Sequence, residues 1–116
     1  MIDCKAGDVL LVRFPFTEID ASKKRPALAL HLVKVGRRSG LATIAMITSK
    51  IDGLTLTGDV RLEQWKEASL LHPSIVRLAK VATVDSTLVE RRLGRMGEKD
   101  LTRIRQGFSD LFQFWV

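Results

Sequence analysis

Short apolar runs separated by turn residues make up most of this chain, and this pattern favours a sheet of short strands. Six runs are expected to form strands: 9–14, 26–35, 41–48, 59–62, 74–84 and 88–95. The tight, glycine-bounded loop at 36–40 requires the strands on either side of it to run antiparallel. One helix is expected over 98–112, where apolar residues recur at spacings of three and four. The sequence therefore predicts a mainly β fold with one α-helix.

The expected strand at 26–35 carries apolar residues on both of its faces. Strict alternation would place Leu28, Leu30 and Leu32 on one face and two alanines with His31 on the other. A strand covered on both sides fits a small, partly open antiparallel barrel with the C-terminal helix laid on it. At 116 residues the chain is expected to be a single domain, 1–116, whose core requires no metal or disulfide.

The charge balance narrows the choice of partner. A net charge of +6 and a pI near 10.0 favour a polyanion such as nucleic acid, an acidic membrane face or an acidic protein. Cys4 is the only cysteine, which excludes an internal disulfide, and no Cys/His cluster has the spacing of a metal site. No apolar run has the length of a membrane span, and no signal-like core opens the chain. We therefore expect a cytoplasmic protein without membrane contact.

Three consecutive cations, Lys23, Lys24 and Arg25, lead directly into Pro26 and the strand that follows. Proline fixes its own φ and pushes the preceding residue toward extended geometry, so Arg25 is expected to be held at a strand entrance. A guanidinium fixed there suits a phosphate, because its planar fork donates two parallel charge-assisted hydrogen bonds. The alternative is that the three cations form a solvated turn and nothing more.

The second candidate residue is Thr48, at the end of the expected strand 41–48. In an antiparallel hairpin the start of one strand lies beside the end of the other, so Arg25 and Thr48 are predicted to be neighbours. Such a pair suits internal attack of a ribose 2′-hydroxyl on the adjacent phosphorus. Arg25 would neutralise charge on the phosphate and help to protonate the leaving oxygen, and Thr48 would hold the phosphate in line. This chemistry needs no metal and selects RNA, because DNA lacks the attacking hydroxyl.

Two histidines acting as general base and acid are the competing catalytic set. His31 lies in the middle of a strand and is expected in the core or an interface, whereas His72 lies in a loop and is expected to face solvent. A nucleophilic serine at Ser49 has no base beside it in the sequence, and clustered carboxylates for two-metal nuclease chemistry are absent.

An ordered set of motifs resembles the MazF/PemK family of toxin endoribonucleases. The motifs are GDVLLV at 7–12, KRPAL at 24–28, ITSKI at 47–51, PSIVR at 73–77, TVD at 83–85 and RLG at 92–94, followed by the terminal helix. The set covers nearly the whole chain, and the stretch 62–71 with Trp65 is most similar to the PemK-like branch. The resemblance implies an SH3-like barrel and a homodimer that cleaves single-stranded RNA at short sequences without a metal or other cofactor.

The resemblance also implies partners and site residues. A cognate antitoxin would be the protein partner, and operator DNA would be reached only through that antitoxin. The catalytic arginine and threonine of the family fall on Arg25 and Thr48, and the loop 16–21 would shape substrate recognition. The predicted RNA-binding residues around the pair are Lys24, Ser49, Lys50 and Lys80.

The sequence also bears on the orientation of Lys80 and on the alternative to an enzyme. Alternation along the strand 74–84 would place Lys80 on the same face as Val76, Leu78, Ala82 and Val84. The alternative to an enzyme is a non-catalytic SH3-like module that binds nucleic acid or a peptide, because the fold alone does not determine the function.

Overall fold

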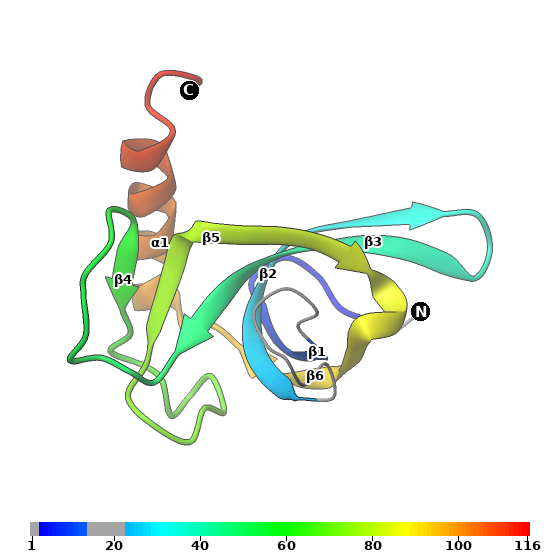
Figure 1. Ribbon diagram of the computed structural model, residues 1–116, viewed down its shortest axis with the longest axis horizontal. Helices are drawn as coiled ribbons and strands as arrows, with labels where there is room; N and C mark the ends of the chain where they lie inside the picture. Colours follow the sequence, from blue (N-terminus) through cyan, green and yellow to red (C-terminus); the bar gives the residue numbers. More distant parts are fainter. Residues whose placement is uncertain (1–2, 14–22) are drawn as a thin grey trace.

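A computed structural model describes residues 3–13 and 23–116. Its strands form one antiparallel sheet with the order β4-β5-β3-β2-β1-β6, so that β4 and β6 are the edges and the sheet is not closed. The elements in chain order are β1 (Asp8–Arg13), β2 (Lys24–Val35), β3 (Ser39–Thr48), β4 (Asp59–Arg61), β5 (Ile75–Asp85), a 3-10 turn (Ser86–Leu88), β6 (Val89–Arg95) and α1 (Glu98–Leu111). The sheet curls strongly, and α1 stands against β4 and β5 (Figure 1).

The predicted fold class is confirmed: the structure is a partly open antiparallel barrel with a C-terminal helix. All six expected strands are present, and the tight turn at 36–38 joins β2 to β3 as expected. Phe14, which was expected to end the first strand, and the loop 16–21 lie outside the described residues.

The sheet is buried on both of its faces. One core is formed by side chains of β1, β2, β3, β5 and β6: Leu10, Val12, Ala27, Ala29, Ala42, Ile44, Val84 and Val89. The other core lies on the opposite face and packs the sheet against the segment 62–70 and α1. From the sheet it includes Val9, Leu28, Ala45, Ile47, Val60, Val76 and Leu78, and from α1 it includes Leu101 and Ile104. The prediction that β2 is covered on both sides is therefore confirmed.

A bulge in β2 overturns the expected sharing of a face by its three leucines. The register with β3 shifts between Ala29 and His31, so that one extra residue, Leu30, lies in β2. Because side chains alternate with a period of two, the extra residue moves every later side chain to the opposite face. Leu30 packs with Leu28 on the helix side, whereas Leu32 packs against the other core. His31 is exposed, so the expectation of a core position is wrong.

The close packing of α1 against the sheet explains the glycine at position 107. A Cβ atom built at this position would come within 2.8 Å of Leu78 Cδ1 and 3.3 Å of Val60 Cγ2. The helix therefore approaches β4 and β5 more closely than an alanine would permit.

Asp8 ties β1 to the edge strand β6. Its carboxylate is 2% exposed, accepts a hydrogen bond from the backbone N–H of Lys5 at 2.9 Å and pairs with Arg92 and Arg95, each at 3.2 Å. Burial by itself would raise the pKa of Asp8, but the Lys5 N–H and the two guanidinium groups outweigh it and hold the pKa below 3.8. The carboxylate is therefore charged in the folded protein at neutral pH.

Candidate active site

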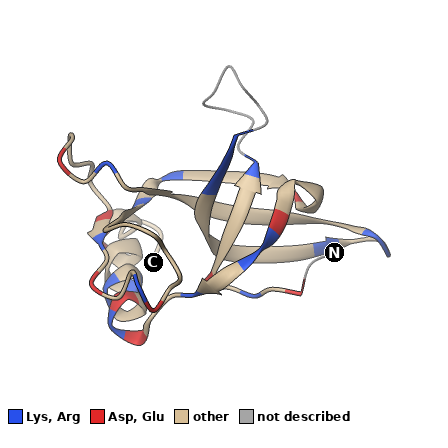
Figure 2. Cartoon of the chain, turned by 90° about the horizontal axis from the view of Figure 1, so that it is seen from below, with Lys and Arg blue, Asp and Glu red and all other residues tan. Residues whose placement is uncertain are grey.

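All six residues that the sequence proposed for the site line one cavity of about 680 Å³. They are Lys24, Arg25, Thr48, Ser49, Lys50 and Lys80. The cavity lies where β2 begins and β3 ends, and apolar side chains of β1, β2, β3 and β6 contribute to its lining. Figure 2 shows that basic positions are frequent on the strands near this end of the sheet. The sequence prediction thus selected residues that share one cavity, and their roles in a reaction stay a prediction.

Strand register explains why Arg25 and Thr48 line the same cavity. In the β2–β3 ladder, Ala27 pairs with Met46 and Leu28 pairs with Ala45. The ladder ends at the pair Ala27–Met46; continued by two residues, the same register would bring Arg25 opposite Thr48. The β2 bulge lies on the other side of these pairs, toward the hairpin turn, so it does not disturb the register near the cavity.

Arg25 is held within the sheet. It is half-buried and pairs with Val12 of β1, and β2 has neighbours on both sides. Lys23, in contrast, precedes the strand and is exposed. The interpretation of the three cations as a solvated turn therefore fails for Arg25, whose backbone belongs to a strand.

Thr48 is the last residue of β3, where it pairs with Ile75 of β5. Its Oγ1 accepts a hydrogen bond from the backbone N–H of Lys50 at 3.1 Å, which turns the chain immediately after the strand. Because the oxygen acts as the acceptor in this bond, the hydroxyl proton remains available to donate to a phosphate oxygen. The same turn leaves Ser49 and Lys50 exposed at the mouth of the cavity.

A large bulge in β5 places Lys80 at the cavity. The register with β3 jumps from the pair Ala45–Val81 to the pair Met46–Arg77, so the residues 78–80 have no partners in β3, and β5 bends sharply (Figure 1). The bulge also overturns the predicted common face. Val76 and Leu78 belong to the helix-side core, Val84 and Ala82 belong to the opposite one, and Lys80 is exposed.

A carboxylate on the edge strand β6 pairs with Lys24. Glu90 of β6 pairs with Lys24 Nζ at 3.5 Å and with Arg13 Nε at 2.6 Å. Desolvation would raise the pKa of Glu90, but the attraction of Arg13 and Lys24 outweighs it, and the net shift is downward. Glu90 therefore stays ionised and restrains Lys24 beside the cavity.

Sequence reasoning missed several residues that line the cavity. Arg91 of β6 belongs to it because β6 pairs with β1: Leu11 of β1 is the ladder partner of Arg91 on one side and of Pro26 on the other. His72 also lines the cavity; it is exposed as predicted, but it faces this site. Arg91 and His72 are far from Arg25 in the sequence, so a local pattern contains no signal for their meeting.

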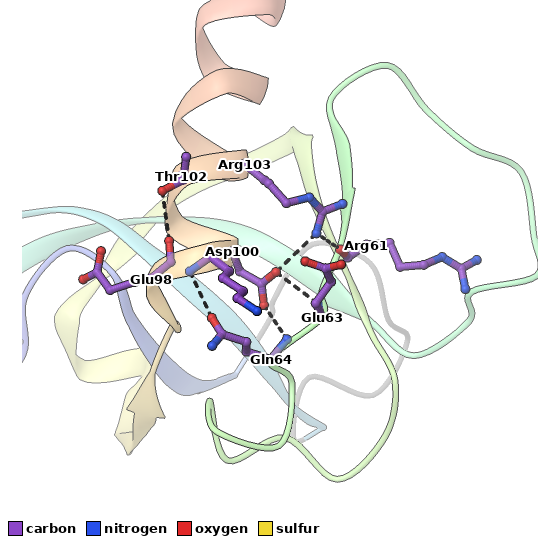
Figure 3. A network of polar contacts seen from close by, with 8 residues as sticks. Arg61, Glu63, Gln64, Glu98, Asp100, Thr102 and Arg103 are labelled. Carbon is purple, nitrogen blue, oxygen red and sulfur yellow. Dashed lines mark hydrogen bonds and ion pairs between the residues drawn. The ribbon is translucent and has the colours of Figure 1, made fainter.

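The segment 69–74 forms one wall of the cavity, and α1 supports the chain just before it. The Asp100 carboxylate, which is 0% exposed, accepts hydrogen bonds from the backbone N–H groups of Glu63 at 3.0 Å and Gln64 at 2.8 Å (Figure 3). Arg103 Nη1 donates to Asp100 at 3.2 Å and also to the carbonyl of Arg61. The turn at 65–69 then leads into the cavity wall, with Ala68 N donating to Gln64 O at 3.1 Å.

Taken together, the fold and the site define a class of protein: a small basic α+β domain whose cavity gathers cations and hydroxyls suited to a phosphate-containing chain. Within residues 3–13 and 23–116, no group of three His, Cys, Asp or Glu side chains is arranged to hold a metal ion. In the same ranges, no helix is long and apolar enough to cross a membrane.

The family model of the PemK-like, MazF-like toxins of type II toxin–antitoxin systems matches residues 5–112. This chain therefore belongs to that family, as the ordered motifs predicted. A comparison with curated protein sequences finds no match.

Solved structures share the fold at low sequence identity. An endoribonuclease in complex with its cognate antitoxin, from a mycobacterial species, has a TM-score of 0.67 at 13% identity, with 96% of each chain covered. MazF from Deinococcus radiodurans has a TM-score of 0.65 at 18% identity, covering 95% of this chain and 96% of that one. The Mycobacterium tuberculosis toxin MazF-mt6 has a TM-score of 0.62 at 18% identity, covering 91% of this chain and 96% of that one.

Proposed function

We propose that this chain is a toxin endoribonuclease that cleaves single-stranded RNA by attack of a ribose 2′-hydroxyl on the adjacent phosphorus. The products are a 2′,3′-cyclic phosphate and a 5′-hydroxyl end. The observation that carries the proposal is the presence of Arg25 and Thr48 in one cavity rich in cations and hydroxyls. Membership of the toxin family supports it, and a structural neighbour is itself an endoribonuclease.

Each residue has a distinct task in this proposal. The half-buried Arg25 guanidinium stabilises the charge that develops on the phosphate oxygens, an effect that is strongest where water is partly excluded. Thr48 donates its hydroxyl proton to a phosphate oxygen and holds the phosphorus in line with the attacking oxygen. Lys24, Ser49, Lys50 and Lys80 bind the phosphates on either side of the cut. RNA carries its own nucleophile and the cavity supplies cations, so the proposed reaction is independent of metal.

The proposal extends to partners. The antitoxin bound to the mycobacterial endoribonuclease supports a cognate antitoxin here, and the net charge of +6 favours an acidic segment in that partner. Operator DNA would be reached only through the antitoxin. We expect a cytoplasmic homodimer, and exposed apolar side chains on the sheet, Val33, Leu41 and Val81, offer surface for subunit contact.

One experiment tests the enzyme against a binding module. The protein is incubated with a mixed RNA pool in chelator, and the new ends are mapped and tested for a 5′-hydroxyl. We expect cuts at a short sequence and a loss of at least about 10²-fold in rate for Arg25→Ala. Arg37→Ala, in the exposed turn between β2 and β3, is the matched control and should cut like the wild type.

Two outcomes refute the enzyme. RNA that is retained by the protein but stays intact would identify the chain as a non-catalytic binding module. Cleavage that survives Arg25→Ala unchanged would remove Arg25 from the reaction.

A further inference from the structure

The proposed reaction requires a group that accepts the proton of the 2′-hydroxyl. Among the described residues that line the cavity, the charged side chains are all cations: Lys24, Arg25, Lys50, Lys80 and Arg91. Lysine and arginine are protonated at neutral pH and donate hydrogen bonds without accepting them, and hydroxyl groups are poor bases. Among these described residues, groups that stabilise a phosphate are therefore abundant, whereas groups that can accept a proton are scarce.

His72 is the one described lining residue whose side chain can readily accept a proton near neutral pH. Histidine is the side chain that changes its protonation between about pH 5 and 8, and its neutral imidazole carries an unprotonated nitrogen. The other histidine, His31, is exposed on β2 and does not line the cavity.

The backbone of His72 is fixed to the strand that pairs with Thr48. Pro73 follows His72 and restricts its conformation to extended geometry. The buried Ser74 donates its hydroxyl hydrogen bond to the carbonyl of His72 at 2.8 Å, and the carbonyl of Ser74 accepts from Leu62 N at 3.0 Å. The next residue, Ile75, is the partner of Thr48 in the β3–β5 ladder. The imidazole is therefore carried by an anchored segment that lines the same cavity and leads directly into the partner strand of Thr48.

We propose that His72 is the general base of this site, an inference that rests on the function proposed above. As the 2′-oxygen forms its bond to phosphorus, the neutral imidazole takes the proton from that hydroxyl. The bond between phosphorus and the 5′-oxygen breaks, and the departing oxygen takes a proton from water. The imidazolium returns its proton to the hydroxide that this leaves, so the site ends as it began. Arg25 and Thr48 keep their roles on the phosphate.

The other charged groups that the structure describes at or next to the cavity are lysines, arginines and Glu90. Lysine and arginine side chains are ordinarily protonated between pH 5 and 8, and those that line the cavity belong to β2, β5, β6 and the turn after β3. Glu90, which pairs with Lys24 next to the cavity, has a lowered pKa and stays ionised in the same range. A change of rate with pH in this window that is lost in His72→Gln would therefore report the imidazole.

The test compares His72→Gln with His31→Gln, the matched control, on an oligoribonucleotide that contains a mapped cut. Single-turnover rates are measured from pH 5 to pH 8. The wild type and His31→Gln should speed up as pH rises through this window. His72→Gln should be slower by about 10² to 10⁴-fold and should lose that rise. Its affinity for an uncleavable 2′-O-methyl RNA should stay within about threefold of the wild type, because a base acts in the transition state and not in binding.

A second variant separates chemistry from structure. His72→Ala with added imidazole should recover part of the lost rate, and Arg25→Ala should not respond to imidazole. A wild type that cuts while His72→Gln cuts equally fast with the same pH profile would overturn this inference alone. A wild type that leaves RNA intact would overturn the proposed function and this inference with it.

Discussion

Replacement of Asp100 by asparagine is expected to destabilise the protein severely, although Asp100 lies in the first turn of α1 near solvent-exposed residues. The carboxylate is 0% exposed and accepts two backbone hydrogen bonds, from Glu63 and Gln64. Asparagine keeps one oxygen but turns an NH₂ group toward one of these N–H donors. That donor is then left without an acceptor in a partly buried place.

The magnitude follows from the contacts. A hydrogen bond to a charged group contributes about 1.5–3 kcal/mol, and an unsatisfied buried donor costs about 1–3 kcal/mol. The favourable interaction of Asp100 with the helix dipole adds about 0.3–1 kcal/mol. The pairing with Arg103 adds little, because the Arg103 side chain is 42% exposed. We expect a total loss of about 3 kcal/mol in the free energy of unfolding.

Urea denaturation measures the effect, and Glu98→Gln is the control. Glu98 is the other acidic residue in the first turn of α1, but its side chain is exposed. At an m-value of about 1.5 kcal/mol/M, Asp100→Asn should lower the urea midpoint by about 2 M. Glu98→Gln should lose about 0.5 kcal/mol or less. Equal midpoints for the two variants would refute the reasoning, since the buried hydrogen bonds are the main difference between them.

Three further predictions concern packing, charge and acid stability. Gly107→Ala should destabilise by about 1 kcal/mol or more in urea, although alanine favours helices, because its Cβ would meet the buried Leu78 at 2.8 Å; a more stable variant would contradict the close approach. Affinity for uncleavable RNA falls as salt rises, and Lys50→Gln should make the plot of log affinity against log salt concentration shallower by about 0.7 in slope. Lys34→Gln, on the hairpin, should leave this slope unchanged. Asp8→Asn should be less stable than the wild type above about pH 4. This gap should close as pH falls below 3.8 and the wild-type carboxylate, whose folded pKa is the lower one, takes up its proton. A gap that is constant from pH 7 to pH 2 would show that the charge of Asp8 does not stabilise the fold.

The parts of the fold that sequence predicted well are those decided by neighbours in the chain. The strands, the turn at 36–38 and the helix over α1 follow from local periodicity and turn residues. The two bulges do not, because an extra residue in a strand leaves no mark on composition. They overturned the expected faces of Leu32 and Lys80, and the second of them is what brings Lys80 to the cavity.

The residues of the candidate site also differ in whether the local sequence could predict their positions. Arg25 and Thr48 lie on the two strands of one hairpin, so counting residues from its turn was sufficient to predict that they line one cavity. Arg91 arrives through the pairing of β6 with β1, and His72 arrives on a segment that follows the turn supported by Asp100. The positions of Arg25 and Thr48, the proposed catalytic pair, are thus set by local chain geometry, whereas the proposed proton acceptor depends on the packing of α1. Weakening the Asp100 network should for this reason slow cleavage more than it weakens RNA binding. An Asp100→Asn protein that remains folded, binds RNA normally and cuts at the wild-type rate would show that the wall carrying His72 does not need this support.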